Sequence, residues 1–273
     1  MHLRKLYGNS FWIFGAIFLC LACLSCEKVI DINLNKANPK YVIEGNLSDI
    51  PGDCRIQITQ TVNFSDLSIF PGVENAVVSI REDQNQPIKL IQTSKGIFES
   101  SLLKARPAHT YTLSVQVDGR EFTSTVKVPQ KVSFDSLYIA DFSGFGNTRK
   151  FANVIFKDAA GLRNSYRFIQ YKNNIANSNI FLLNDEYSDG RVINTFLAFF
   201  DTSDNQRLDS GDKVMVEMQG IDPSVYTFFQ SLSQSSTGGN ESVAPGNPVS
   251  NIKGGAIGYF NAYVKQRRTV TVP

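Results

Sequence analysis

Residues 110–128 have the sequence TYTLSVQVDGREFTSTVKV, which decides how the chain folds. Every second residue from Tyr111 to Val117 is apolar and the residues between them are polar, which is typical of a β-strand with one buried and one solvent-exposed face. A second alternating segment follows, and Asp118-Gly119 separates the two. Asp-Gly between two such segments is a strong hairpin signal, so this stretch predicts two antiparallel strands joined by a tight turn.

Short alternating segments of the same kind fill residues 40–128. They are YVIEGNL, CRIQITQTV, AVVSI, IKLIQ, GIFES, TYTLSVQV and EFTSTVKV. About seven short strands separated by turn residues predict an immunoglobulin-like β-sandwich over residues 40–128. Pro129-Gln130-Lys131 follows this region, and because proline interrupts strand pairing we place a domain boundary there.

Residues 132–273 contain longer strand-like segments. These are FDSLYIADF, KFANVIFKD, SYRFIQYKN, INTFLAFFD, DKVMVEMQGI, GAIGYFNAYV and RRTVTV. They predict a larger antiparallel β domain, either a sandwich or barrel-like, so the whole chain is expected to be mainly β. Residues 194–200 are apolar on both faces of the expected strand, which indicates a strand in the centre of a sheet or one that another element covers.

One convincing helix is expected in this second region, at about residues 223–234. Asp222 can cap its start, and Pro223 suits the first helical position. Apolar residues, including Val225 and Phe228, then recur at helical spacing along one face. We expect this helix to pack on the second sheet and to cover the strand at residues 194–200.

The first 26 residues carry the features of an export signal. Basic side chains stand at the start: His2, Arg4 and Lys5. The apolar run that follows ends at Leu24, too short for a comfortable bilayer crossing, which needs roughly 20 apolar residues. We therefore expect residues 1–25 to be a lipoprotein signal peptide that is removed. Cys26 then carries the lipid and residues 26–39 form a tether. Cys23 is the alternative lipid acceptor, and an uncleaved anchor helix is the other interpretation.

The charge of the expected mature chain excludes one class of partner. Removing residues 1–25 lowers Lys plus Arg from 27 to 25, equal to the 25 Asp plus Glu, so the formal net charge is zero. Proteins bind nucleic acid mainly by neutralising phosphates, and this neutral chain has no basic run for that purpose. Nucleic acid is therefore not an expected partner.

The sequence offers no catalytic constellation. His109 is the only histidine after the signal and Cys54 the only thiol besides Cys26, too few for the three or four ligands of a zinc site. We expect a solvated turn histidine at 109 and a buried thiol at 54, in phase with its apolar neighbours. The oxygen-rich stretch 201–212 lacks the glycine of an EF-hand loop and is expected to be a solvated loop. No catalytic residue, metal or cofactor is predicted.

A long polar loop, from Ser233 to Gly254, is the expected contact surface for a partner, since long loops in compact domains are often functional. The motif at its return into a strand has two interpretations, a partner-contact motif and a turn motif. Its residues are Asn251, Ile252, Gly254, Gly255 and Gly258.

Several segments, taken in order, resemble a known family. They are CEK at 26–28, ID at 30–31, VIEG at 42–45, NAVVSI at 75–80, YTL at 111–113, PVSNI at 248–252 and GGAIGYF at 254–260. This order is similar to that of the domain-of-unknown-function family 4249, lipoproteins of Bacteroidota. The C-terminal Pro-x-x-x-Asn-Ile-x-x-Gly-x-x-Gly-x-Phe pattern is the specific part, and the resemblance supplies no catalytic residue.

The resemblance implies a lipid-anchored outer-membrane protein, often encoded beside a TonB-dependent receptor. We therefore expect a non-catalytic accessory component that binds a ligand or a partner for such a receptor and that contacts the membrane through its N-terminal lipid. The alternative is a structural or adhesive β-sandwich protein of the cell envelope. The ligand, and the choice between the periplasmic and the cell-surface face of the outer membrane, stay open at this point.

Overall fold

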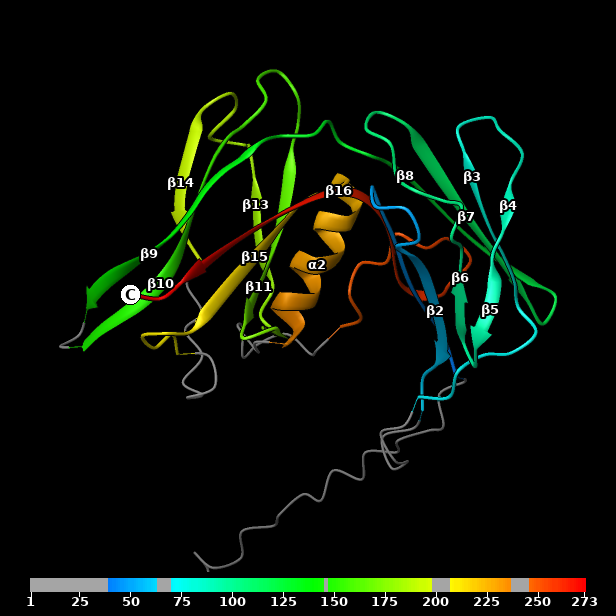
Figure 1. Ribbon diagram of the computed structural model, residues 1–273. Helices are drawn as coiled ribbons and strands as arrows, with labels where there is room; N and C mark the ends of the chain where they lie inside the picture. The colour runs from blue at the N-terminus through cyan, green and yellow to red at the C-terminus, as the bar shows by residue number, and fades with distance from the viewer. Residues whose placement is uncertain (1–38, 63–69, 145–146, 198–206, 237–245) are drawn as a thin grey trace, which may run out of the picture. The chain divides into compact units, whose positions relative to one another are not determined.

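An immunoglobulin-like sandwich forms the first part of the fold. The computed structural model describes residues 39–62, 70–144, 147–197, 207–236 and 246–273 (Figure 1). One sheet of the sandwich has the order β1-β2-β6-β5 and the other the order β4-β3-β7-β8. The strands are β1 (Tyr41–Ser48), β2 (Cys54–Gln60), β3 (Val77–Glu82), β4 (Ile88–Lys89), β5 (Ile91–Ser94), β6 (Ile97–Glu99), β7 (Thr110–Val117) and β8 (Arg120–Lys127). These orders correspond to the A-B-E-D and C-F-G sheets of an immunoglobulin domain, with β4 added beside strand C, so this part of the predicted fold is confirmed.

The predicted hairpin at residues 110–128 is present. Val117 pairs with Arg120, and Asp118 and Gly119 between them have φ angles of 48° and 70°. Positive φ at both central residues is what a two-residue type I′ turn needs. Cys54, on β2, is buried in the core as predicted.

Tyr111 makes a second immunoglobulin-like feature at the start of β7. Its hydroxyl accepts a hydrogen bond from the backbone N–H of Arg106 at 3.1 Å and lies 3.0 Å from the Lys104 carbonyl oxygen. A tyrosine near the start of strand F that bonds back to the preceding backbone is the tyrosine corner of such sandwiches. This contact holds the segment before β7 against the sheet.

A second sandwich follows. Its smaller sheet has the order β14-β10-β9, and its other sheet contains β12-β11-β15-β16, with β13 paired to β11. The strands are β9 (Phe134–Gly144), β10 (Asn147–Lys157), β11 (Ser165–Lys172), β12 (Ile175–Ala176), β13 (Phe181–Asn184), β14 (Val192–Phe196), β15 (Lys213–Gly220) and β16 (Ile257–Thr271). Side chains such as Val154 and Phe156 on β10 meet Phe168 and Val216 from the facing sheet in a separate core. Since all the described sheets have edge strands, the predicted sandwich-like alternative is the one observed.

The predicted domain boundary at residues 129–131 does not divide the fold, because β16 belongs to both parts. Residues 257–263 of β16 pair in parallel with β1, and residues 264–271 pair antiparallel with β15. One sheet therefore runs from β12 to β5, and residues 39–273 form one compact unit. The two C-terminal segments expected as successive strands are a single strand. Pairing between residues more than 200 positions apart leaves no local trace in the sequence, whereas Pro129 is a local signal for the end of a strand.

The helix α2 (Pro223–Ser236) begins at the predicted residue and contacts β11, β13 and β16, so it packs on a sheet of the second region as predicted. The strand at residues 194–200, which it was expected to cover, belongs to the other sheet. Asp222 caps the helix, accepting a hydrogen bond at 2.8 Å from the Ser224 N–H. Its apolar face, with Phe228 and Phe229, packs on Tyr259 of β16 and joins the first core. In Figure 1 α2 runs beside β11, which it contacts together with β13.

The strand that α2 was expected to cover is at the edge of a sheet. β14 pairs with β10 on one side only, and Phe196 is 40% exposed. The ring of Phe196 instead stacks on that of Phe142, on β9, and contacts the tilted ring of Phe151, on β10. The two apolar faces of residues 194–200 therefore do not indicate a central strand, and residues 198–200 lie outside the described part of the chain.

Candidate functional site

The predicted lipid acceptors, Cys26 and Cys23, lie outside the described residues, as does the stretch 237–245 of the predicted contact loop. Among the described helices, none is long and apolar enough to cross a bilayer. Of the oxygen-rich stretch 201–212, the structure describes its end, where Asp212 accepts a hydrogen bond from the Asp209 N–H and pairs with Lys172.

Asn251 ties the end of the predicted contact loop to two elements of the fold. Its side-chain amide donates to the Phe260 carbonyl oxygen at 3.0 Å and to the Ser224 hydroxyl at 3.2 Å, and its oxygen accepts from the Phe260 N–H at 2.9 Å. It therefore joins β16 to the first turn of α2. Its neighbour Ile252 is buried in the first core.

The three glycines of the same motif all have positive φ angles, 98° at Gly254, 89° at Gly255 and 122° at Gly258. A Cβ at Gly254 would lie 2.5 Å from the Glu121 carbonyl oxygen, and one at Gly258 would lie 2.0 Å from the Ile43 carbonyl oxygen. Only glycine fits such close backbone approaches. The described contacts of the motif are therefore within the fold, which fits the turn interpretation.

Asn251→Ala is expected to lower the free energy of unfolding by roughly 2–4 kcal/mol, because it leaves a backbone N–H and a carbonyl of β16 without their partner. Urea denaturation measures this loss, and Asn247→Ala, at an exposed position of the same loop, is the control. Unchanged stability together with lost partner binding would instead support the contact interpretation.

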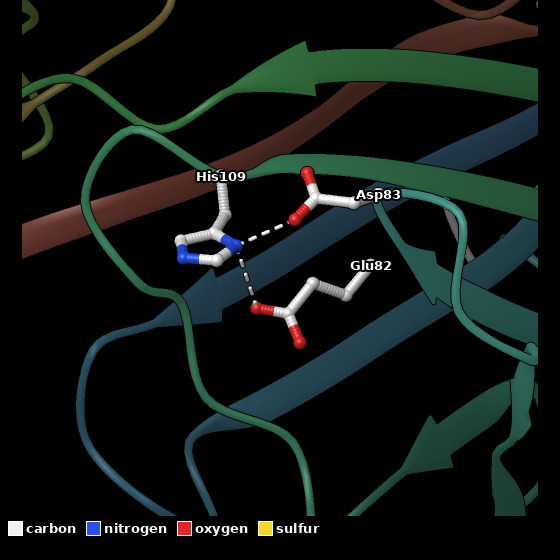
Figure 2. A group of neighbouring side chains, drawn as sticks. All are labelled: Glu82, Asp83 and His109. Carbon is white, nitrogen blue, oxygen red and sulfur yellow. Dashed lines mark hydrogen bonds and ion pairs between the residues drawn. The ribbon is translucent and has the colours of Figure 1, made fainter.

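His109 is not a freely solvated turn residue, because it belongs to a cluster with Glu82 and Asp83 (Figure 2). Glu82 ends β3, Asp83 follows with a φ of 48°, and His109 precedes β7. The Nδ1 atom of His109 lies 2.6 Å from Asp83 Oδ2 and 3.4 Å from Glu82 Oε1. The ring therefore links the turn after β3 to the start of β7.

Basic and polar groups already satisfy the two carboxylates of this cluster. Arg106 donates from Nε to Glu82 Oε1 at 2.6 Å and from Nη2 to Oε2, and the Tyr111 hydroxyl lies 2.7 Å from Oε1. These contacts, led by Arg106, lower the pKa of Glu82, and the Thr110 N–H and then His109 lower that of Asp83. Burial, followed by Glu82, raises the pKa of Tyr111 to about 12. A metal ion would have to displace Arg106, so this arrangement suits a structural clamp.

The clamp predicts a pH dependence of stability. Because the folded pKa values of Glu82 and Asp83 lie below their ordinary values of 4.5 and 3.8, their contribution is present above those values and is lost as the pH falls through the folded ones. In denaturation measured from pH 7 to pH 3, Glu82→Gln should be less stable than wild type at pH 7, and this difference should shrink towards pH 3. The control Glu186→Gln, at an exposed side chain, should follow the wild-type profile; a constant difference for Glu82→Gln would contradict the clamp.

A second site is a cleft of about 560 Å³, in the range of small-molecule pockets. Its walls are the loop of residues 161–165, residues 184–186 with Asp189, and the first turn of α2, where Tyr226 and Thr227 face it. This cleft lies beside the ends of β11 and β13.

Three carboxylates meet beside this cleft: Asp158 directly after β10, Asp185 directly after β13, and Asp189 in the loop before β14. Their oxygens lie within 4.8 Å of one another. Asp158 accepts hydrogen bonds from the Tyr166 hydroxyl and the Gly190 N–H. Burial, followed by the bond to Asp158, raises the pKa of Tyr166. The Asn164 N–H donates to Asp185 at 2.7 Å, and the Gly161 N–H donates to Asp189 at 2.7 Å.

This cluster was not predicted from the sequence, although two of its three aspartates carry a local signal. Asp185, Asp189 and Gly190 have the spacing of the first, fifth and sixth positions of an EF-hand calcium loop. Tyr187 stands at the third position, so the pattern is incomplete. Asp158, which completes the group in space, is 27 positions before Asp185 and has no recognisable spacing to it.

These features define a mainly β protein with two sandwiches that share one long strand. The family model described as "Domain of unknown function (DUF4249)" matches residues 27–269, so the chain belongs to this family, as the sequence predicted. A search of curated proteins found no match. One similar solved structure, titled "Cytokine receptor complex - Crystal form 1A", is 9% identical over 68% of this chain and 85% of that chain, with a TM-score of 0.25, too low to support an argument.

Proposed function

We propose that this protein is a non-catalytic, lipid-anchored accessory component of a TonB-dependent outer-membrane receptor, and that it binds a ligand or a partner for that receptor. The position of Cys26 is the main support for the proposed lipid anchor. The family match begins at residue 27, directly after it, and the compact unit begins at Pro39. The twelve residues between them reach at most about 40 Å, and such a short tether raises the effective concentration of the β unit near a membrane partner.

Two observations support binding rather than catalysis. The cleft beside α2 has the volume of a small-molecule site, and its walls present both polar and apolar surface. The residues that catalysis would most readily use have structural positions instead. Cys54 is buried, and burial raises the pKa of its thiol to about 12, while the Nδ1 atom of His109 faces Asp83 and Glu82.

The adhesive alternative has less support from the sheet edges. Assembly by strand addition needs a regular free edge. At β5, one edge of the large sheet, the side chains are exposed, but the pairing with β6 shifts register between Gln92 and Ser94. Such irregularity hinders the addition of another strand. We expect the purified protein to form no fibres in light scattering and electron microscopy, and ordered fibres would favour the adhesive alternative.

Affinity purification of the tagged full chain from detergent-solubilised membranes tests the proposed function. We expect a TonB-dependent receptor to be recovered in a fixed ratio to the tagged chain, as measured by quantitative mass spectrometry. An unrelated tagged lipoprotein from the same membranes is the control. Repeated recovery of the chain without any such receptor would overturn the proposal.

A further inference from the structure

The three carboxylates beside the cleft have no directly bonded basic partner among the described residues, although Arg163 also lines this cleft. Asp158 is 2% exposed and Asp185 is 7% exposed. In the part of the chain that the structure describes, neither they nor Asp189 form an ion pair with a basic side chain. A buried carboxylate without a counter-charge is unfavourable, and a second carboxylate nearby raises the free energy further. Hydrogen bonds from the Tyr166 hydroxyl, the Asn164 side-chain amide and the Gly190 N–H offset part of this cost at Asp158, and a bound cation would offset it further.

One oxygen of the buried Asp185 side chain is open to a ligand. Its Oδ2 atom accepts the hydrogen bond from the Asn164 N–H, whereas no described donor is bonded to Oδ1. Asp185 lines the cleft, although more than nine-tenths of the residue is buried. Asp189 also lines the cleft and likewise has one oxygen bonded, to the Gly161 N–H. Backbone groups thus fix the carboxylates and leave acceptor oxygens for an ion.

The two carboxylate clusters differ in the positive charge that surrounds them. Glu82 and Asp83 also lie within ligand distance of each other and of His109, but Arg106 and His109 supply positive charge there. The Asp158 cluster has carboxylates only. Ligand sets made only of oxygen favour Ca²⁺ or Mg²⁺ over zinc or copper. Ca²⁺ accepts irregular geometry and longer bonds than Mg²⁺, which suits three carboxylates held in place by separate segments.

We propose that Asp158, Asp185 and Asp189 bind one Ca²⁺ beside the cleft. The ion would neutralise the two buried carboxylates and fasten the loop of residues 185–190 to the end of β10. The ion would lie beside the cleft that the proposed function identifies as a ligand site. A role of the ion in ligand recognition rests on that proposed function. Binding of the ion itself does not depend on a receptor.

Calcium titration of the full chain, purified in detergent and stripped with EDTA, tests this proposal. Isothermal titration with CaCl₂ should show one site, with MgCl₂ at least tenfold weaker. When free Ca²⁺ is about a hundred times its Kd, the melting temperature should rise by roughly 5–10 °C. Asp189→Asn, at an exposed side chain that folding tolerates, should weaken Ca²⁺ binding at least tenfold.

Two matched controls separate the site from general surface binding. Glu186→Gln removes a carboxylate from the wall of the same cleft, and Asp83→Asn removes one from the other cluster; both should bind Ca²⁺ as the wild type does. Absence of a Ca²⁺ heat and of a thermal shift, or equal weakening in Asp189→Asn and Glu186→Gln, would overturn the proposal. Ca²⁺ binding without receptor recovery would contradict only the proposed function, and receptor recovery without Ca²⁺ binding only the ion site.

Discussion

Gly258→Ala should lower the free energy of unfolding by more than about 4 kcal/mol, or prevent folding altogether. A Cβ at this position would lie 2.0 Å from the Ile43 carbonyl oxygen, and the φ angle of 122° is one that residues other than glycine rarely adopt. Gly258 is paired with Ile43 in the parallel ladder between β1 and β16. Relief of the clash requires the two strands to move apart, and because β16 also pairs with β15, the damage should reach both sandwiches.

Gly255→Ala is the matched control for this prediction. Its φ angle of 89° is also strained for alanine, but the nearest atom to a Cβ there is Arg120 Nη2 at 3.9 Å. The free energy of unfolding of this control should therefore fall only by the cost of the strained φ angle, roughly 1–2 kcal/mol. Guanidinium denaturation followed by circular dichroism compares the variants. Equal losses in the two would show that the close approach to Ile43 is not what requires glycine at 258.

Cys26→Ala should move the protein almost completely from the membrane fraction to the soluble fraction. One thiol carries the whole lipid anchor in the proposed function, so its removal should leave no attachment to the membrane. Immunoblots of fractionated cells measure the distribution. Stable lipid anchoring is strong, since each buried CH₂ contributes about 0.8 kcal/mol, so partial release is not expected.

Two further cysteine variants make this result specific. Cys23→Ala should stay in the membrane fraction if Cys26 is the acceptor. Cys54→Ala should also stay attached, although it leaves a small cavity in the first core, where Cys54 is buried. Membrane retention of Cys26→Ala, with release of Cys23→Ala, would assign the lipid to Cys23.

Local patterns predicted the secondary structure well where each strand has one buried and one exposed face. The alternation at residues 110–117 and the Asp118-Gly119 turn correspond directly to β7 and the hairpin. The start of α2 was also predictable, because Asp222 and Pro223 act within one turn of helix. These signals act over a few residues, so the sequence shows them without knowledge of the fold.

Contacts between distant segments could not be predicted in the same way. The pairing of β1 with β16 joins residues more than 200 positions apart, and no sequence pattern in either strand indicates that the other is its partner. The apolar residues of 196–200 suggested a central strand, whereas Phe196, on the edge strand β14, contacts the exposed Phe142 on β9 and the half-buried Phe151 on β10. Hydrophobicity alone does not distinguish burial in a core from such side-chain stacking on a sheet face.

The candidate sites also differ in how far they depend on local sequence patterns or on contacts between distant residues. The motif from Asn251 to Gly258 was visible in the sequence, and the structure assigns Asn251, Gly254 and Gly258 contacts within the fold. The carboxylate cluster was not visible as a group, because Asp158 and Asp185 come together only when β10 and β13 are placed in space. His109 stands alone in the sequence, and only the turn after β3 brings the acidic pair to it.

The proposed attachment to the outer membrane depends most directly on the chemistry of Cys26. The measurement that tests it is the intact mass of the protein purified from membranes, combined with fragmentation of its N-terminus. We predict a chain that lacks residues 1–25 and begins with a lipid-modified Cys26. A chain that still begins at Met1, or one that carries its lipid on Cys23, would contradict the assignment of Cys26 as the anchor.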